Sequence, residues 1–326
     1  MKWKGETAMK IIVTPPFTAD QKELIKKAAG ENELVFCEKP DLTEEILADA
    51  EVVLGNLDNP SQLKWAGSLK WIQLNNAGTE GYCTPGVLPE DAVLTNATGA
   101  YGLAISEYMV GCLFVLRKKL HQYHSNQLEH KWQSAGHVGV VQGTTVLVIG
   151  LGDIGKTFAG KMKALGCYTI GVKRRMSEKP AEVDELYTIE DLDKLLPRAD
   201  VIAMSMPGNA ETRHTLNRER IAMLKENAVI INVGRGPAID TDALCEALYA
   251  QKIAGAALDV TDPEPLPADH PLWDAPGALI TPHTSGGYAL PETLSQIAVI
   301  CAENLERYLK GEPLKNIIDL KTGYCK

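Results

Sequence analysis

Three polar residues of complementary chemistry lie in the second half of the chain, each shortly after an apolar segment. They are Arg235, Glu264 and His283, separated by 29 and 19 residues. The planar guanidinium of an arginine pairs with a carboxylate through two parallel hydrogen bonds. A histidine exchanges a proton near neutral pH, and a carboxylate on its second ring nitrogen fixes the tautomer. The set favours proton transfer to the carbonyl oxygen of a bound 2-oxo acid. Taken singly, a loop histidine or a glutamate between prolines more often has only a structural role.

A glycine-rich turn points to the cofactor that such a reaction needs. Gly150, Gly152 and Gly155 follow the apolar segment 145–149 and open a helical pattern, the context in which a G-x-G-x-x-G motif binds a dinucleotide. The first glycine permits the tight turn, the second lets the backbone approach a pyrophosphate, and the third lets helix and strand pack closely. The helix N-terminus offers unpaired N–H groups to phosphate. The alternative is a turn that only connects a strand to a helix.

Three cations stand where a dinucleotide-binding sequence usually has an acid. Lys173 lies 18 residues after Gly155 and is followed by Arg174 and Arg175. An acid at this place bonds the adenosine ribose, whereas an arginine accommodates the 2′-phosphate of NADP. Each charge-assisted contact to phosphate contributes about 1.5–3 kcal/mol. The sequence therefore predicts NADP(H) as the preferred cofactor and NAD(H) as the second choice. The competing interpretation is a solvated basic loop.

The elements that must position these residues alternate between short apolar segments and helical patterns, which is typical of parallel α/β sheets. Strands are expected at 10–14, 34–36, 52–54, 71–74, 145–149, 168–172, 201–204, 228–233, 255–259 and 278–280. Helices are expected at 19–29, 104–127, 155–165 and 291–310. Ligands of open α/β sheets bind outside the carboxyl ends of the strands, which is where the arginine, glutamate and histidine stand.

The pattern predicts an α/β protein of two Rossmann-like, doubly wound parallel-sheet domains with a cleft between them. We expect residues 105–290 to form the dinucleotide-binding domain. Residues 1–104 and 291–326 are expected to form a discontinuous substrate (catalytic) domain, because the closing helix follows the last strand of the second sheet. A chain of 326 residues is longer than one hydrophobic core usually serves.

Composition narrows the class of protein. A net charge of −9 argues against a general nucleic-acid or membrane-surface role, and no run of 18 apolar residues predicts a membrane span. Seven scattered cysteines without a CxxC pair favour reduced thiols and a cytoplasmic location. Residues 1–8 are interpreted either as an extension ahead of the first strand or as the product of an early start codon. His121, His124, His130 and His137 lack a completing carboxylate or cysteine, so no metal site is expected.

These motifs resemble the D-isomer-specific 2-hydroxyacid dehydrogenase family over most of the chain. The most specific stretches are VIGLGDIG (148–155), NVGRGPAID (232–240), ALDVTDPEPLP (257–267) and TPHTSGG (281–287). The resemblance implies that Arg235 binds and polarises the substrate, that Glu264 orients His283, and that His283 is the acid and base. It also implies a homodimer paired through the long helix of the dinucleotide-binding domain and the segment after it.

The resemblance extends to the residues around the two ligands. It implies that the backbone of Asn76, Ala77 and Gly78 binds the substrate carboxylate. The cofactor-binding residues that it implies, besides the glycines and cations above, are Asp153, Ile154, Met206, Pro207, Thr212, Val233, Gly234, Asp259 and Gly286. Asp259 would face the nicotinamide carboxamide. The chain departs from the usual family pattern at Lys173, at Met206, where a histidine is common, and at Glu80, where an aspartate is common.

The sequence therefore predicts NAD(P)H-dependent reduction of a small 2-oxo acid, similar to glyoxylate or hydroxypyruvate, to a D-2-hydroxy acid. One alternative is D-3-phosphoglycerate dehydrogenase, which the missing cations in loop 55–59 and the Lys173 cluster both disfavour. The other is a dinucleotide-sensing, corepressor-like binding protein, which the absence of added tails for partner motifs disfavours. Nucleic acid and membrane are not expected as partners.

Overall fold

The structure is a computed structural model that describes residues 8–79, 81–288, 290–323 and 325. Glu80 and most of the predicted N-terminal extension lie outside the described residues. Contacts divide the chain into two compact units, Met1–Tyr101 with Tyr288–Lys326 (unit 1) and Gly102–Gly287 (unit 2). Every described helix is too short or too polar to cross a bilayer. All seven cysteines are free.

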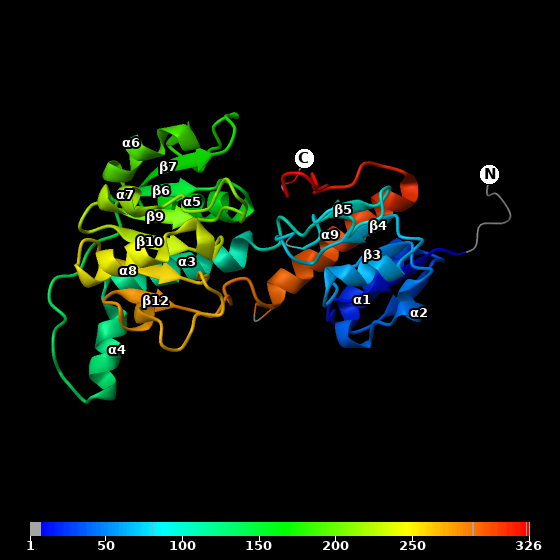
Figure 1. Cartoon of the computed structure of the whole chain (residues 1–326), viewed down its shortest axis with the longest axis horizontal. Helices are drawn as coiled ribbons and strands as arrows, with labels where there is room; N and C mark the ends of the chain where they lie inside the picture. The colour runs from blue at the N-terminus through cyan, green and yellow to red at the C-terminus, as the bar shows by residue number, and fades with distance from the viewer. Residues whose placement is uncertain (1–7, 80, 289, 324, 326) are drawn as a thin grey trace. The chain divides into compact units, whose positions relative to one another are not determined.

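Unit 1 is built on a five-stranded parallel sheet in the order β2-β1-β3-β4-β5. Its strands are β1 Lys10–Val13, β2 Glu33–Phe36, β3 Val52–Leu54, β4 Trp71–Gln73 and β5 Val93–Thr95. Its helices are α1 Ala19–Ala29, α2 Glu44–Leu47 and α9 Pro291–Lys310, with short 3₁₀ turns at Lys39–Asp41 and Pro60–Trp65. Helix α9 joins this unit late in the chain and packs against α1 (Figure 1).

Local sequence explains how α1 and α9 are fixed. Thr18 and Gln21 form a reciprocal capping box at the start of α1, which satisfies two of its unpaired N–H groups. Helix α9 is tied to β4 by a buried contact, in which Asn304 Nδ2 donates to Gln73 Oε1 at 2.8 Å. Both side chains are fully buried and hydrogen-bonded, as buried polar groups must be. The C-terminal helix is therefore part of the first sheet's core.

Unit 2 contains a seven-stranded parallel sheet in the order β12-β11-β10-β9-β6-β7-β8. Its strands are β6 Thr145–Ile149, β7 Tyr168–Lys173, β8 Glu185–Thr188, β9 Val201–Met204, β10 Val229–Asn232, β11 Gly255–Leu258 and β12 Ala278–Ile280. Its helices are α3 Gly102–Arg117, α4 Leu120–Leu128, α5 Asp153–Ala164, α6 Leu192–Leu195, α7 Arg218–Ala222 and α8 Thr241–Tyr249. Short 3₁₀ turns lie at Ile189–Asp191, Leu196–Arg198, Gly236–Ala238 and Pro271–Asp274. The strand order reverses between β6 and β9, the switch point where such sheets bind ligands.

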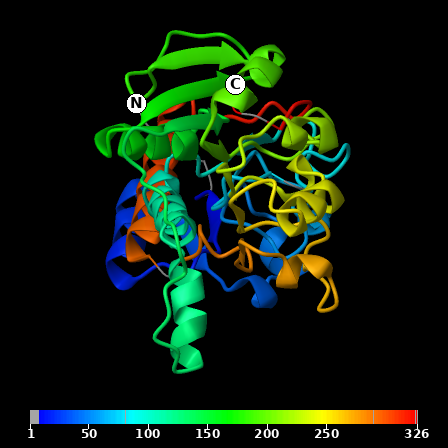
Figure 2. The ribbon, with the colours of Figure 1, turned by 90° about the vertical axis from the view of Figure 1, so that its left-hand side faces the viewer.

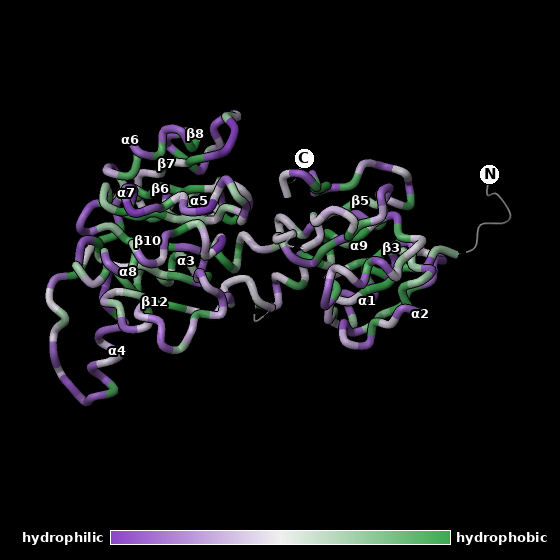
Figure 3. Tube along the Cα trace, viewed as in Figure 1, coloured by the Kyte–Doolittle hydropathy of each residue, from purple (hydrophilic) through white to green (hydrophobic). Residues whose placement is uncertain are grey.

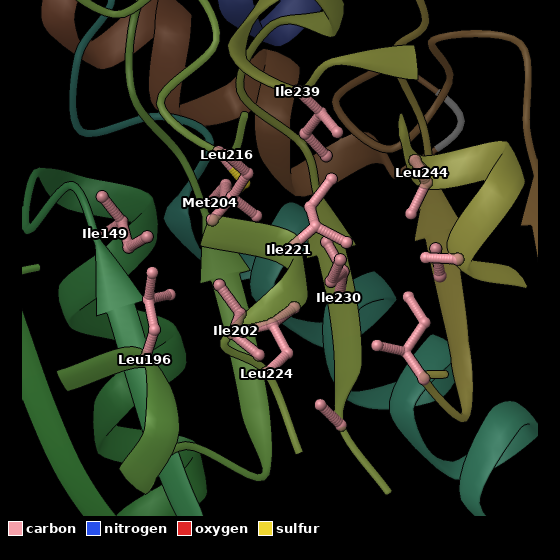
Figure 4. Close-up of a cluster of buried hydrophobic side chains, with 14 of the residues drawn as sticks. Ile149, Leu196, Ile202, Met204, Leu216, Ile221, Leu224, Ile230, Ile239 and Leu244 are labelled. Atoms are coloured by element: carbon pink, nitrogen blue, oxygen red, sulfur yellow. The ribbon is translucent and has the colours of Figure 1, made fainter. Parts of the chain in front are cut away.

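The central strands β6, β9, β10 and β11 of unit 2 are buried on both faces, as is typical of a parallel sheet. On one face Ile149, Ile202, Met204 and Ile230 pack against side chains from the segments that cover them, including Ile221 of α7 (Figure 4). Helices α3 and α5 pack together and contact the sheet through β10, β11, β6 and β7. Hydrophobic residues run along β10 and β12, whereas α4 is mainly hydrophilic (Figure 3). This core holds the carboxyl ends of the strands at one edge.

The structure confirms the predicted class, two parallel-sheet α/β domains, and corrects several details. Helices α2, α6, α7 and α8 were not among the expected helices. The helix expected over 104–127 is two helices, because Lys119 takes a left-handed conformation with φ 54° between α3 and α4. Helix α4 and the loop after it project away from the sheet of unit 2 (Figure 2). The edge strands β5 and β8 were not expected, and each pairs with one neighbour only. All other expected strands and helices are present with small shifts at their ends.

Candidate active site

The three polar residues follow three neighbouring strands. Arg235 comes after β10, Glu264 after β11 and His283 after β12, and these strands lie side by side in the sheet. Because parallel strands end at the same edge, all three loops emerge there. The sequence predicted that each residue lies at the end of a strand, because each follows an apolar segment.

The structure brings Glu264 and His283 into direct contact. His283 Nδ1 lies 2.7 Å from Glu264 Oε1. Since a carboxylate only accepts, this contact assigns the proton to Nδ1 in the neutral ring, which leaves Nε2 as the exchanging nitrogen. The side chains of His283 and Glu264 are 48% and 41% exposed. In the described part of the chain, no hydrogen bond uses Nε2, so this nitrogen is available to a ligand.

The backbone of His283 is held in an uncommon conformation. Its φ is +50°, in the left-handed region that residues other than glycine seldom adopt. Its N–H donates to the carbonyl oxygens of Asp259 at 2.8 Å and Thr281 at 3.0 Å. Such conformations persist where the surroundings over-determine them, and they gather at functional sites.

Asp259 organises the loop that carries His283. Its side chain is 2% exposed, and its two oxygens accept four hydrogen bonds from Thr281, Thr284 and Ser285. None of the ion pairs of the described residues includes Asp259. A buried carboxylate without a cation needs this full set of donors. Sequence reasoning identified Asp259 but missed Thr281 and Ser285, whose place in the TPHTSGG stretch beside His283 was the available signal.

Arg235 stands on a tightly packed turn. Asn232 is fully buried, accepts from Gly234 N–H at 3.0 Å, and donates to the Arg235 carbonyl at 2.9 Å. The guanidinium Nη1 donates to the Gly234 carbonyl at 2.6 Å. The arginine stem packs over Gly208, where an added Cβ would lie 2.9 Å from Arg235 Cγ. The structure thus fixes the arginine beside the loop after β9, and Asn232 is a further residue that sequence reasoning missed.

The three glycines of the turn after β6 occupy three different environments. Gly150 has φ +98°, which only glycine adopts readily. A Cβ on Gly155 would lie 1.9 Å from the Gly150 carbonyl oxygen, so helix α5 packs directly on the turn. A Cβ on Gly152 would meet nothing within 4 Å. The middle glycine therefore faces open space, as the approach of a pyrophosphate requires.

The start of α5 is uncapped. Gly152 is its N-cap residue, and no side chain bonds the first N–H groups, which include those of Asp153 and Ile154. The Asp153 carboxylate instead accepts from Gly102 N–H at 2.8 Å, at the start of α3. A helix N-terminus with unpaired N–H groups attracts phosphate. The turn and the helix start fit the pyrophosphate of a dinucleotide.

The predicted cation cluster lies beside this turn. Lys173 ends β7, the neighbour of β6, and Gly150 N–H donates to the Val172 carbonyl at 3.0 Å. The Lys173 ammonium donates to Ser177 Oγ at 2.9 Å, and Arg174 and Arg175 follow as exposed residues. The cluster therefore has the position, relative to the turn, at which cofactors of this class carry their adenosine ribose.

The remaining predicted cofactor residues surround the same strand ends. The backbone of Met206 lies against both Gly150 and Gly234, and Thr212 Oγ1 donates to the Pro207 carbonyl at 2.9 Å. Val233 is buried and its N–H donates to the Met204 carbonyl at 3.0 Å. Gly286 directly follows the serine bonded to Asp259. All these segments follow β6, β9, β10 and β12 within unit 2.

The predicted substrate residues Asn76, Ala77 and Gly78 follow β4 in unit 1. The Asn76 carbonyl accepts from Ala97 N–H at 3.0 Å, and the Ala77 carbonyl accepts from the Asn96 amide at 2.6 Å. The N–H groups of the three residues enter none of the hydrogen bonds among described residues. The carbonyl groups of Asn76 and Ala77 thus fix the loop through hydrogen bonds. The three consecutive N–H groups can donate to an acceptor such as a bound carboxylate.

Comparison with known proteins gives a consistent result. Residues 110–285 match the family described as D-isomer specific 2-hydroxyacid dehydrogenase, NAD binding domain. A family protein from Aeromonas salmonicida subsp. salmonicida is similar in structure, with a TM-score of 0.84, 33% identity and coverage of 96% of this chain and 100% of that chain. The NADPH-dependent glyoxylate/hydroxypyruvate reductase from Sinorhizobium meliloti, in complex with NADP and sulfate, has a TM-score of 0.82, 26% identity and coverage of 97% and 100%.

A phosphoglycerate enzyme is also similar in sequence. D-3-phosphoglycerate dehydrogenase from Methanocaldococcus jannaschii is 30% identical over 96% of this chain, which spans only 60% of the length of that protein. The match over the dinucleotide-binding region, together with similarity over nearly the whole chain, decides the family. The chain belongs to the D-isomer specific 2-hydroxyacid dehydrogenases.

Proposed function

We propose that this protein reduces a small, unphosphorylated 2-oxo acid to a D-2-hydroxy acid with a nicotinamide cofactor. The observation that carries the proposal is the 2.7 Å contact between His283 Nδ1 and Glu264 Oε1 at the edge of a dinucleotide-binding sheet. The contact fixes the ring, and Nε2 then gives a proton to the substrate carbonyl oxygen. Arg235 binds the substrate carboxylate through its guanidinium fork and polarises the carbonyl beside it.

The residues present fit the cofactor. The N–H groups at the start of α5 and the open space at Gly152 would hold the pyrophosphate, and Met206, Pro207 and Thr212 would form the loop that binds the adenosine. When bound, the reduced nicotinamide supplies the hydride. The N–H groups of Asn76, Ala77 and Gly78 would also bind the substrate carboxylate. Glu264 stabilises the positive charge of His283 before the proton leaves.

Within this proposal the cofactor is preferentially NADP(H). Lys173, Arg174 and Arg175 provide three cations at the strand end beside the turn. An acid that would repel the 2′-phosphate is missing at that place. Structural similarity to the NADPH-dependent reductase from Sinorhizobium meliloti also supports NADP(H). NAD(H) remains the second cofactor of the proposal.

The substrate is proposed to lack a phosphate group. Loop 55–59 (GNLDN) contains no lysine or arginine to neutralise one. Its backbone is fixed by neutral contacts, since Asn56 N–H donates to Asn75 Oδ1 and Leu57 N–H donates to the Tyr82 hydroxyl. This disfavours 3-phosphoglycerate and favours acids of the size of glyoxylate and hydroxypyruvate.

Two copies are proposed to pair through α4 and the loop after it. The exposed large apolar residues of this region are Leu120, Tyr123, Leu128, Trp132, Val138 and Val140. Grouped exposed apolar side chains mark interaction surfaces. Sedimentation should give a dimer for the native chain and a monomer for Leu128→Lys with Trp132→Lys. A native monomer would remove dimerisation from the proposal.

The test of the activity is the initial rate of cofactor oxidation with glyoxylate and hydroxypyruvate, run in parallel with NADPH and NADH. We expect turnover with both acids and faster turnover with NADPH. Oxidation of 3-phosphoglycerate with NAD, in the absence of these activities, would assign the chain to phosphoglycerate dehydrogenase. Cofactor binding without turnover of any 2-oxo acid would assign it to a dinucleotide-sensing protein.

A further inference from the structure

Helix α3 contributes a hydroxyl to the loop of His283. Tyr108 lies in the middle of α3, which packs against β10 and β11 (Figure 1). Its phenol oxygen is 2.5 Å from Thr281 Oγ1. Thr281 Oγ1 is in turn 2.7 Å from Asp259 Oδ1. The three side chains form one hydrogen-bonded chain from the helix to the buried carboxylate.

The chemistry of the three groups fixes the direction of this chain. A threonine hydroxyl has a single proton, and a carboxylate only accepts. Thr281 therefore donates its proton to Asp259 and accepts from the phenol of Tyr108. Burial raises the pKa of the Tyr108 phenol, and a hydrogen bond with the Cys112 side chain adds to the effect. The phenol stays protonated at neutral pH and is a permanent donor.

Asp259 connects this hydrogen-bonded chain to the residues around His283. Beyond Thr281, its carboxylate accepts from Thr284 N–H at 2.9 Å and from Ser285 N–H at 3.1 Å. Its backbone carbonyl accepts from His283 N–H at 2.8 Å. The left-handed backbone of His283 is thus held on both sides by bonds to one residue. The orientation of that carboxylate decides where the imidazole stands.

We propose that Tyr108 is a positioning residue of the reaction, acting through Thr281 and Asp259 to hold the His283 loop. The inference rests on the proposed reductase function. Among the hydrogen bonds of the described residues, Tyr108 has none to His283 or to a predicted ligand-binding residue, and the motifs quoted above do not include it. Polar chains of this kind strengthen one another in a buried setting. Loss of the first donor weakens the bond from Thr281 to Asp259 and loosens the loop.

The experiment compares Tyr108→Phe, Thr281→Val, Thr281→Ser and the double variant Tyr108→Phe with Thr281→Val. We expect Tyr108→Phe to lower kcat about 3- to 10-fold, the size of one hydrogen bond, with the KM of the 2-oxo acid changed less than about twofold. Thr281→Ser keeps the hydroxyl and should stay near the native kcat. Because Tyr108 acts through Thr281, the double variant should be no slower than Thr281→Val.

The matched control is Tyr249→Phe. It removes a tyrosine hydroxyl of the same unit whose one hydrogen bond among the described residues goes to the Pro271 carbonyl. It should leave kcat and KM unchanged. The proposal is overturned if Tyr108→Phe behaves like the control, if the loss appears in KM alone, or if the losses of Tyr108→Phe and Thr281→Val multiply in the double variant.

Hydrogen exchange separates this inference from the proposed function. The amide N–H groups of His283, Thr284 and Ser285 should exchange faster in Tyr108→Phe than in the native chain. Their exchange rates in Tyr249→Phe should equal those of the native chain. This measurement does not depend on turnover. If no 2-oxo acid reacts but the exchange changes as expected, the proposed function fails and the structural part of the inference stands. Unchanged exchange refutes the positioning role whatever the activity.

Discussion

His283 Nδ1 and Glu264 Oε1 stand 2.7 Å apart although the two residues belong to loops after different strands. The parallel pairing of β11 with β12 brings these loops together. The contact leaves only Nε2 to exchange a proton with a ligand. In the proposed reaction, His283 transfers the proton and Glu264 orients the imidazole.

Replacement of this pair should separate the two roles. His283→Ala removes the proton donor and should lower kcat about 100-fold or more. Glu264→Gln keeps a hydrogen-bonding side chain but loses the charge. It should lower kcat about 10-fold, which corresponds to the loss of one charge-assisted hydrogen bond. Steady-state kinetics with glyoxylate measures both. Near-native turnover of His283→Ala would remove His283 from the reaction.

Gly155→Ala should destabilise unit 2. The new methyl group would lie 1.9 Å from the Gly150 carbonyl oxygen, a backbone atom that cannot move aside. We expect a loss of about 3 kcal/mol or more in the free energy of unfolding. The control is Gly160→Ala in the same helix, whose methyl would meet only a flexible Glu182 side chain at 3.4 Å. It should gain about 0.5–1 kcal/mol. Equal stabilities in denaturant unfolding would contradict the packing argument.

Gly152→Ala should act on the cofactor and spare the fold. Its methyl would meet no protein atom within 4 Å, and its φ of −79° suits alanine. We expect an unchanged melting temperature and a Kd for NADPH raised about 10-fold or more, because the methyl fills the approach of the pyrophosphate. Titration by cofactor fluorescence measures the Kd. Native affinity would place the dinucleotide elsewhere.

Sequence alone predicted most of the fold because buried parallel strands read as apolar segments. The segments TVLVI and VIIN became β6 and β10, and the polar residues after the strands followed from topology. The edge strands β5 (VLT) and β8 (ELYT) were missed because each contains only two adjacent apolar residues, too few to indicate a buried strand. Strand β8 begins at Glu185, whose ion pair with Arg198 anchors this half-buried strand.

The break between α3 and α4 could not be read from the sequence. Lys118-Lys119 carries no glycine or proline to mark it. The break is held by distant contacts, because Lys118 Nζ donates to the Gly139 carbonyl and Lys119 Nζ to the Ala135 carbonyl, both at 2.8 Å. The bonds of Thr281 and Ser285 to Asp259 likewise depend on tertiary placement. Local sequence propensity cannot predict the helix break or these hydrogen bonds.

Arg174→Ala should affect the two nicotinamide cofactors unequally. Loss of one cation at the adenosine end should raise the KM for NADPH about 10-fold or more, by one charge-assisted contact, and that for NADH much less. The control is Lys194→Ala, an exposed cation of the same unit paired with Asp191, which should change neither. Equal effects of Arg174→Ala on both cofactors would make the cluster an ordinary basic loop.

The cluster around Glu185 predicts how stability depends on acid. Hydrogen bonds from Arg198 and then from Tyr187 lower the pKa of Glu185 to about 2 in the folded chain, against about 4.3 in an unfolded one. A carboxyl whose folded pKa is lowered contributes stability above its unfolded pKa, and that contribution is lost as the pH falls from about 4.3 towards 2.

The melting temperature of the native chain should therefore fall more steeply between pH 5 and pH 3 than that of Glu185→Gln, which has no charge to lose. At pH 7 the variant should melt lower, because it has lost the ion pair. The control is Glu226→Gln, an exposed glutamate in none of the ion pairs of the described residues, which should follow the native curve. Parallel curves for the native chain and Glu185→Gln would show that the ion pair does not stabilise the edge of the sheet.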